Sequence, residues 1–177
     1  MKKGVLLLTL FVSVFLVYNY FAQINYFNFA EQKIKKYNPK RKGIVIIVDY
    51  RKNIFSDRLF VLDMNQKKII MSCKVSHAWN SGVLFPTSYS NVPGTNKTSK
   101  GVYITRGTKY GNFGYSMVID GLDQSINNNA KYRAIIFHSD RKMKTKWSNG
   151  CFATPEKTNK KIIDLTKNGV LVCVIET

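Results

Sequence analysis

Acidic residues are scarce in this sequence: 10 Asp and Glu stand against 28 Lys and Arg, which leaves a net charge of +18. A charge this large favours negatively charged partners such as an anionic membrane face, an acidic polymer or nucleic acid. The lysines are nevertheless scattered and occur together with abundant Asn and Ile, as compositional drift alone would produce. No aromatic and basic residues are interleaved in a recognised nucleic-acid-binding pattern, so we expect no nucleic-acid partner.

Residues that bind metals are also few, with three cysteines and two histidines. The cysteines form no Cys-x-x-Cys pair and the histidines are not at zinc-finger intervals, so we expect no metal site and no cofactor. Cys73 and Cys173 lie in strand-like apolar runs, where a free cysteine usually behaves as a small buried hydrophobic residue. The alternative is a disulfide between them, if the compartment is oxidising.

An apolar run from Gly4 to Ala22 follows Lys2 and Lys3, which is the form of an export signal. As a helix, its 19 residues span roughly 28 Å, close to the thickness of the hydrocarbon core of a bilayer. Tyr20 stands where an Ala-x-Ala cleavage site needs a small residue, which favours an uncleaved anchor over a cleaved signal. We therefore assign residues 1–22 to a signal peptide or membrane anchor. The protein is expected in the cell envelope, exported to a periplasmic or other extracytoplasmic side and anchored to the inner or plasma membrane.

Residues 23–42 are expected to form a short juxtamembrane helix and linker, ending in a basic cluster that could contact anionic headgroups. Residues 43–177 are expected to form one mostly β domain of the α+β class, with one main helix. Its predicted strands cover residues 44–48, 58–64, 68–75, 101–105, 115–120, 133–137 and 170–175. Between them we expect an ordered loop at 76–100, a glycine-rich bend at 107–114 and a short helix at 127–132. The main helix is predicted at 155–168, after the Thr154 cap and before the Asn168-Gly169 stop.

The segment Ser148-Asn149-Gly150-Cys151-Phe152 lies thirteen residues after His138. A thiol needs a base or positive surroundings to react as a thiolate at neutral pH, and an imidazole can take its proton. Gly150 lets the backbone approach closely, and the N–H groups of Gly150 and Cys151 could stabilise an oxyanion. The pair predicts acyl transfer through a thioester, although spacing alone does not distinguish it from a chance pair.

A series of short motifs between residues 43 and 176 adds to this prediction. They are His77-Ala78-Trp79-Asn80-Ser81-Gly82, Tyr89-Ser90-Asn91-Val92-Pro93-Gly94, Thr98-Ser99-Lys100-Gly101, Gly114-Tyr115-Ser116, Asp120-Gly121-Leu122, Asn127 with Ala130 and Arg133, Ile135-Ile136-Phe137-His138, and Ser148-Asn149-Gly150-Cys151. In this order they resemble the L,D-transpeptidase catalytic domain (the YkuD fold), and most closely its murein L,D-transpeptidase catalytic domain-like subgroup.

The resemblance implies a β-sandwich with its main helix after the catalytic Cys, and a reaction on peptidoglycan stem peptides. It implies that Cys151 is the nucleophile and His138 the base, that Gly150 with Cys151 supplies oxyanion N–H groups, and that Ser148 and Asn149 position the turn. Five further residues are candidate substrate-binding residues: His77, Ser90, Asn91, Tyr115 and Arg133. A second stem amine would resolve the thioester in a transpeptidase, and water in an L,D-carboxypeptidase; a non-catalytic basic wall- or membrane-binding module on the same fold is the other alternative. We expect a monomer.

The sequence departs from the family pattern beside the thiol. Asn149 stands where the wider family has His and the subgroup Trp, and Trp147 and Phe152 replace the subgroup's Arg and Pro. These changes alter how a stem carboxylate would be held. The segment 139–147 is short, which predicts a reduced lid, and its lysines Lys142, Lys144 and Lys146 could bind substrate carboxylates or form a solvated loop. For His77 we favour a structural hydrogen-bonding role over a role in the reaction.

Overall fold

The computed structural model describes residue 8, residue 12 and residues 25–140 and 147–176. The expected signal peptide or anchor at residues 1–22 therefore lies, except for Leu8 and Val12, outside the described residues. Within the described part of the chain, no helix combines the length and the apolar character needed to cross a bilayer.

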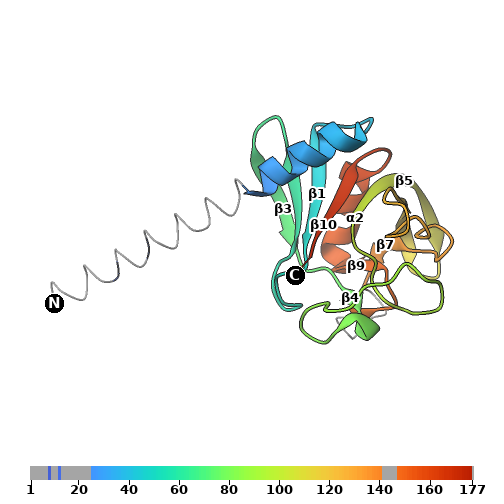
Figure 1. The fold of residues 1–177 in the computed structure, drawn as a ribbon. Helices are drawn as coiled ribbons and strands as arrows, with labels where there is room; N and C mark the ends of the chain where they lie inside the picture. Colours follow the sequence, from blue (N-terminus) through green and yellow to red (C-terminus); the bar gives the residue numbers. More distant parts are fainter. Residues whose placement is uncertain (1–7, 9–11, 13–24, 141–146, 177) are drawn as a thin grey trace.

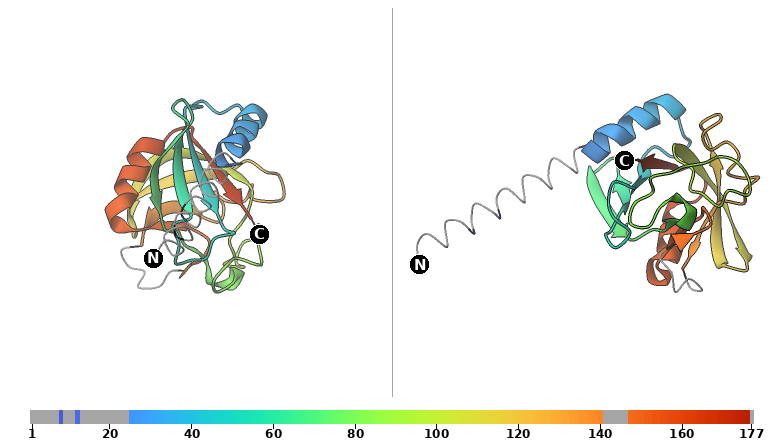
Figure 2. Two further views of the ribbon diagram at one scale, coloured as in Figure 1. Left: turned by 90° about the vertical axis from the view of Figure 1, so that its left-hand side faces the viewer. Right: turned by 60° about the horizontal axis from the view of Figure 1, so that its bottom comes forward.

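One curled eight-stranded sheet forms the centre of the domain (Figures 1 and 2). In spatial order its strands are β3 (Lys68–Cys73), β2 (Leu59–Asp63), β1 (Ile44–Asp49), β10 (Leu171–Ile175), β5 (Val102–Gly111), β6 (Gly114–Gly121), β7 (Ile136–Ser139) and β9 (Phe152–Thr154). A second, two-stranded sheet pairs β4 (His77–Ala78) with β8 (Trp147–Ser148), and a 3-10 turn (Trp79–Ser81) follows β4. The other helices are α2 (Glu156–Thr166) and a helix at residues 25–37.

The two helices cover opposite faces of the sheet. Side chains alternate between the faces of a strand, and in β1 Ile46 and Val48 pack in a cluster with Ile162 and Ile163 of α2. The alternate residues Val45 and Ile47 pack in a second cluster with Tyr26, Phe27 and Ala30 of the 25–37 helix. The prediction that residues 44–48 form a strand buried on both faces is thereby confirmed.

Two expectations about the architecture need correction. The expected sandwich is one curled sheet, and in the described residues the domain includes a second helix, at residues 25–37, besides the predicted main helix. The helix expected in residues 23–42 is present, but it packs into the core on the sheet face, so it is not a free linker. Cys73 and Cys173 are buried, as predicted, yet both are free thiols in different clusters, so the alternative disulfide is absent.

The glycine-rich bend expected at 107–114 is instead part of a long hairpin of β5 and β6. A register shift between Thr105 and Thr108 absorbs Gly107 as a bulge, so β5 continues to Gly111. The chain turns only between Gly111 and Gly114, where Gly114 has a φ of 71°. Bulges of this kind let a strand continue with a local bend.

The short helix expected at 127–132 is a series of turns. The Asn127 side chain explains the difference, since its Nδ2 donates to the carbonyls of Lys100 and Val102 and its Oδ1 accepts from the Asp123 N–H. Asn side chains that bond the backbone in this way compete with helical hydrogen bonding.

The ends of α2 are partly as predicted. Asn168 and Gly169 take positive φ angles of 64° and 99° and end the helix. At the start, Thr154 does not cap the helix: its Oγ1 bonds Asn159 Oδ1, and Pro155 stands at the cap position without a side-chain bond.

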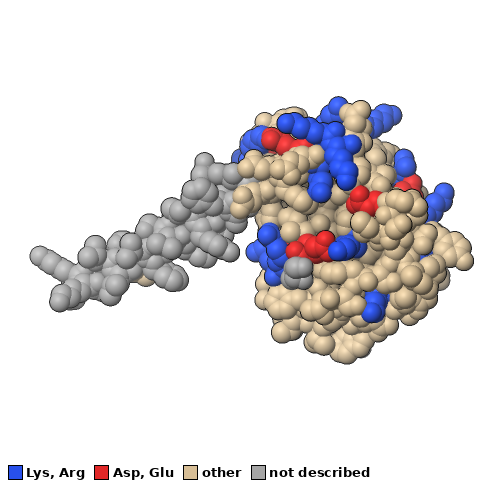
Figure 3. Space-filling view, viewed as in Figure 1, with Lys and Arg blue, Asp and Glu red and all other residues tan. Residues whose placement is uncertain are grey.

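Charge is unevenly distributed on the face shown in Figure 3. Lys and Arg gather over and around the 25–37 helix, whereas the lower part of that face, where β4 and its loop lie, is largely uncharged. Several of these lysines are already paired, as Lys67 is with Glu31 and Lys100 with Glu176.

Candidate active site

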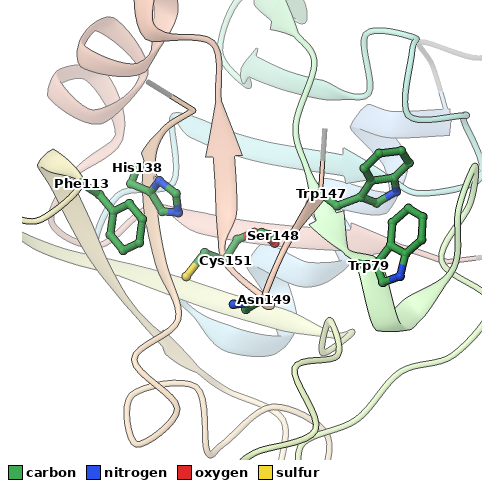
Figure 4. Close-up of a pocket in the computed structure, with 7 residues that line it drawn as sticks. All are labelled: Trp79, Phe113, His138, Trp147, Ser148, Asn149 and Cys151. Atoms are coloured by element: carbon green, nitrogen blue, oxygen red, sulfur yellow. The ribbon is translucent and has the colours of Figure 1, made fainter. Parts of the chain in front are cut away.

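A pocket of about 620 Å³ lies beside the ends of β7 and β8 (Figure 4). Seven residues line it: Trp79, Phe113, His138, Trp147, Ser148, Asn149 and Cys151. They come from the turn after β4, the tip of the β5–β6 hairpin, β7, β8 and the turn before β9. In Figure 4 the sulfur of Cys151 is directed to the side of the pocket on which His138 and Phe113 lie.

Strand pairing brings the predicted nucleophile and base together. β7 and β9 run parallel as neighbours, with Phe137 opposite Phe152 and His138 opposite Ala153. Cys151 directly precedes Phe152, and His138 directly follows Phe137. The pairing of β7 with β9 therefore brings the turn that carries Cys151 to the same edge of the sheet as His138, although the two residues are thirteen positions apart in sequence.

The turn before Cys151 is held by Ser148. Ser148 Oγ donates to the Cys151 carbonyl at 2.7 Å and accepts from the Gly150 N–H at 3.1 Å. The predicted orienting role of Ser148 fits these bonds. The Gly150 N–H is consequently occupied inside the turn, so of the two predicted oxyanion donors the Cys151 N–H is the one that the turn leaves available.

Gly150 is required at its position for steric reasons. Its φ of 118° is one that side-chain-bearing residues rarely adopt. A Cβ there would lie 2.9 Å from Ile135 Cδ1 and 3.1 Å from the Lys97 carbonyl oxygen. The close backbone approach that the sequence predicted at Gly150 is therefore made to Ile135 and Lys97.

The Cys151 thiol is partly exposed at the pocket, and its Sγ lies 3.7 Å from the Ala134 carbonyl oxygen, a weak hydrogen bond. Burial raises the pKa of the thiol, while the Ile136 backbone N–H and the positive charges of Arg133 and Lys109 oppose that rise. The protein thus supplies groups that favour the thiolate without fully offsetting its desolvation.

His138 is buried, and its Nδ1 lies 2.7 Å from the Ser139 carbonyl oxygen. A carbonyl only accepts, so Nδ1 carries the proton and Nε2 has the free lone pair. The Phe113 ring stacks on the imidazole with centroids 4.2 Å apart. Burial lowers the pKa of His138, while the Ser139 carbonyl and the Asp140 charge act in the opposite direction. The ring is therefore neutral and able to accept a proton at neutral pH.

His77 lies outside this pocket and is fully buried. Its Nδ1 accepts from Arg58 Nη2 and its Nε2 donates to the Gly82 carbonyl, both at 2.8 Å. Desolvation by burial lowers its pKa to about 4. Both ring nitrogens are used internally, which fits the structural alternative rather than substrate binding.

The other four candidate substrate-binding residues also lie outside the pocket lining. Asn91 bridges two loops through Asn128 and Asn129, and Tyr115 donates to Asp164 at 2.6 Å. The Ser90 carbonyl accepts from Arg133 Nη1 at 2.7 Å. Arg133 itself lies behind the Gly150 turn, with Nη2 3.3 Å from the position that a Cβ would take there.

Three aromatic pocket residues were not predicted as site residues: Trp79, Phe113 and Trp147. Trp79 and Trp147 pack edge to face with centroids 4.6 Å apart, and Trp147 Nε1 donates to the Val83 carbonyl. The only sequence signal that could have identified one of them is that Trp147 directly precedes Ser148. Lys142, Lys144 and Lys146 lie outside the described residues, as does most of the segment expected to form a reduced lid. Within the described residues, no group of three His, Cys, Asp or Glu could hold a metal ion.

A mostly β domain that brings a Cys and a His into one pocket, with a further group orienting the His, is the arrangement expected of a cysteine-dependent acyl-transfer protein. The chain belongs to the L,D-transpeptidase catalytic domain family, whose model matches residues 19–175. The resemblance stated from the sequence motifs is thereby confirmed.

Solved structures agree on the fold. The helical cell shape determining protein Pgp2 from Campylobacter jejuni aligns with a TM-score of 0.53 at 15% identity, over 78% of this chain and 49% of that one. The avibactam carbamoyl form of the enzyme Ldtfm aligns with a TM-score of 0.50 at 15% identity, over 76% of this chain and 49% of that one. This chain thus spans about half the length of each. No curated protein sequence matches significantly.

Proposed function

We propose that the protein is an L,D-transpeptidase that transfers acyl groups between peptidoglycan stem peptides through a Cys151 thioester, with His138 as the base. The family match supports the reaction class. The observation that carries the residue assignment is the pocket shared by Cys151 and His138, in which the Nδ1 bond to Ser139 leaves Nε2 free.

In the first half-reaction the Cys151 thiol gives its proton to His138 Nε2, and the sulfur attacks the carbonyl of the third stem residue, meso-diaminopimelate or an equivalent. The oxyanion accepts from the Cys151 N–H. The C–N bond to D-Ala breaks, and D-Ala leaves with the proton that His138 returns. The enzyme then holds the stem as a thioester.

In the second half-reaction a side-chain amine of another stem attacks the thioester and gives its proton to His138. The C–S bond breaks, the thiol regains that proton, and a 3–3 cross-link results. Water in place of the amine gives an L,D-carboxypeptidase with the same site. We further propose that the protein acts as a monomer in the cell envelope, attached to the membrane through residues 1–22.

A non-catalytic wall-binding module on the same fold is the second candidate. The burial that raises the pKa of Cys151 favours it, as does Asn149 in a position where the family has His or Trp. The two candidates differ in one measurable property, which is release of D-Ala from a stem peptide.

The test is incubation of the full chain with a defined tetrapeptide stem, with and without an amine acceptor, followed by mass analysis. A cross-linked product supports transpeptidation, the tripeptide alone supports the carboxypeptidase, and unchanged tetrapeptide supports the binding module. Cys151→Ala is expected to lose all product while keeping its circular dichroism spectrum. Cys73→Ala removes a buried thiol away from the pocket and, per folded molecule, is expected to keep the activity. Equal turnover in Cys151→Ala and the natural protein contradicts the proposal.

A further inference from the structure

The guanidinium of Arg133 is fixed behind the turn that carries the thiol. Its Nη1 donates to the Ser90 carbonyl and the Ser99 hydroxyl, and its Nη2 donates to the Lys97 carbonyl. All three acceptors are uncharged. Among the described residues, no carboxylate lies within ion-pair distance of Arg133, in contrast to Arg51 and Arg106, which pair with Asp49 and Asp120.

Arg133 also contacts the turn itself. Its Nη2 would lie 3.3 Å from a Cβ at Gly150, and the Lys97 carbonyl to which it donates would lie 3.1 Å from the same point. The guanidinium and its acceptor thus form the surface against which Gly150 packs. A residue that fills this place determines where the backbone of the next residue, Cys151, is held.

We propose that Arg133 is a positioning residue for Cys151, which supports the Gly150 turn from behind and whose uncompensated positive charge favours the thiolate over the thiol. A role of Arg133 in catalysis rests on the proposed function, but the effect of Arg133 on the Cys151 thiol can be measured without any substrate. It replaces the expectation that Arg133 binds substrate, because the Arg133 donors are directed to the Ser90, Lys97 and Ser99 acceptors.

The charge of Arg133 acts on a thiol that has few other supporting charges. His138 on β7 is neutral, since burial lowers its pKa, and Asp140 partly opposes that lowering. Lys109 on β5 is the other cation that acts on the thiol, with a smaller effect than Arg133, and the Ile136 N–H adds a hydrogen bond. Removal of the Arg133 charge therefore removes the larger of the two cationic contributions from the described residues.

The experiment measures the rate at which iodoacetamide alkylates Cys151 in the full chain between pH 5 and 10, with the modified peptide identified by mass. Arg133→Gln is expected to move the midpoint of the profile upward by about one pH unit, because the positive charge that favours the thiolate is removed. Arg133→Lys keeps the charge and is expected to hold the midpoint within about half a unit of the natural protein. Its transpeptidase kcat is expected to fall, because the fork of hydrogen bonds that supports the turn is lost.

Arg106→Gln is the matched control, because it removes an arginine that pairs with Asp120 on the hairpin and does not line the pocket. It is expected to leave the midpoint unchanged. An Arg133→Gln midpoint equal to that of Arg106→Gln overturns the proposal. If Arg133→Gln does not fold, Arg133→Lys is used for the test. A midpoint that rises by a full pH unit in Arg133→Lys, which keeps the charge, overturns the proposal.

The outcome is separable from that of the proposed function. Failure of the natural protein to process a stem peptide contradicts the proposed function and leaves the alkylation profile measurable. An unchanged profile in a protein that does process the stem contradicts only the role of Arg133.

Discussion

At the scale of single residues, the site depends on how two titratable groups are desolvated. Burial raises the pKa of the Cys151 thiol and lowers the pKa of His138. Both shifts favour the neutral pair at rest, with the thiol protonated and the imidazole unprotonated. In the proposed mechanism, proton transfer from sulfur to Nε2 creates the thiolate and the imidazolium together.

The contribution of Phe113 to this balance can be tested directly. Phe113 stacks on His138 and shields it from water, so Phe113→Ala is expected to raise the pKa of His138 toward the ordinary value of a histidine. NMR titration of the two histidine rings measures this, and His77 serves as an internal reference because it lies outside the pocket. The acidic limb of the kcat/KM profile is expected to move upward with it. A His138 titration identical to that of the natural protein would contradict the shielding role.

At the scale of elements, the helix at 25–37 has the largest difference between expectation and structure. Its local signal was sufficient to predict a helix. Tyr26, Phe27, Ala30 and Ile34 repeat at helical spacing, and they form the face that packs on β1 and β10. Since β1 is apolar on both faces, a second covering layer was implied by the sequence as well. Each signal is local, and only the fold shows that the helix turns back onto the strand that follows it.

Phe27→Ala tests whether this helix is an integral part of the domain. Phe27 is 6% exposed in the second core cluster, so its truncation is expected to lower the free energy of unfolding by about 3 kcal/mol. The neighbouring Asn28 is exposed, and Asn28→Ala is expected to change stability by less than about 0.5 kcal/mol. Urea unfolding followed by fluorescence gives both values. Equal stability of the two variants would indicate that this segment is a linker and not part of the folded domain.

The difference between local sequence patterns and long-range pairing also explains which parts of the site the sequence could predict. Cys151, His138 and Ser148 stand beside buried strands or in a turn with Gly, so local patterns identify them. Trp79 and Trp147 meet only because β4 pairs with β8 across almost seventy residues, with His77 opposite Trp147. Phe113 reaches His138 because a bulge extends the β5–β6 hairpin. Such pairings depend on long-range register, which no local spacing encodes.

At the scale of the whole molecule, a buried cation joins the sheet to the long loop beside the pocket. Arg58 at the start of β2 is fully buried, and its guanidinium donates to the Val75 carbonyl and to His77. His77 in turn donates to Gly82, in the loop that follows Trp79. The Tyr50 ring lies 4.9 Å from the guanidinium carbon. This network holds only while His77 is neutral, because Nδ1 must accept from Arg58.

Acid is therefore expected to destabilise the fold through His77. Its pKa is about 4 in the folded chain against 6.5 for an ordinary histidine, so the unfolded chain binds the proton more tightly. The stability that the neutral ring contributes is complete above pH 6.5 and decreases as the pH falls toward 4. The expected loss relative to pH 7.5 is on the order of 1 kcal/mol at pH 5.5 and about twice that at pH 4.5. His138, whose pKa is also lowered, adds to it in the same direction.

His77→Gln separates this effect from the carboxylates, such as Asp164 with a pKa of about 2, which titrate at lower pH. The variant is expected to be less stable than the natural protein at pH 7.5, because Gln does not reproduce both hydrogen bonds of a buried ring. Its stability is also expected to fall less between pH 7.5 and 4.5, because the group responsible for most of the slope is gone. Urea unfolding of both proteins at the three pH values measures the two slopes. Parallel slopes would show that the pH dependence arises elsewhere, and the buried Arg58–His77 pair would then have no part in it.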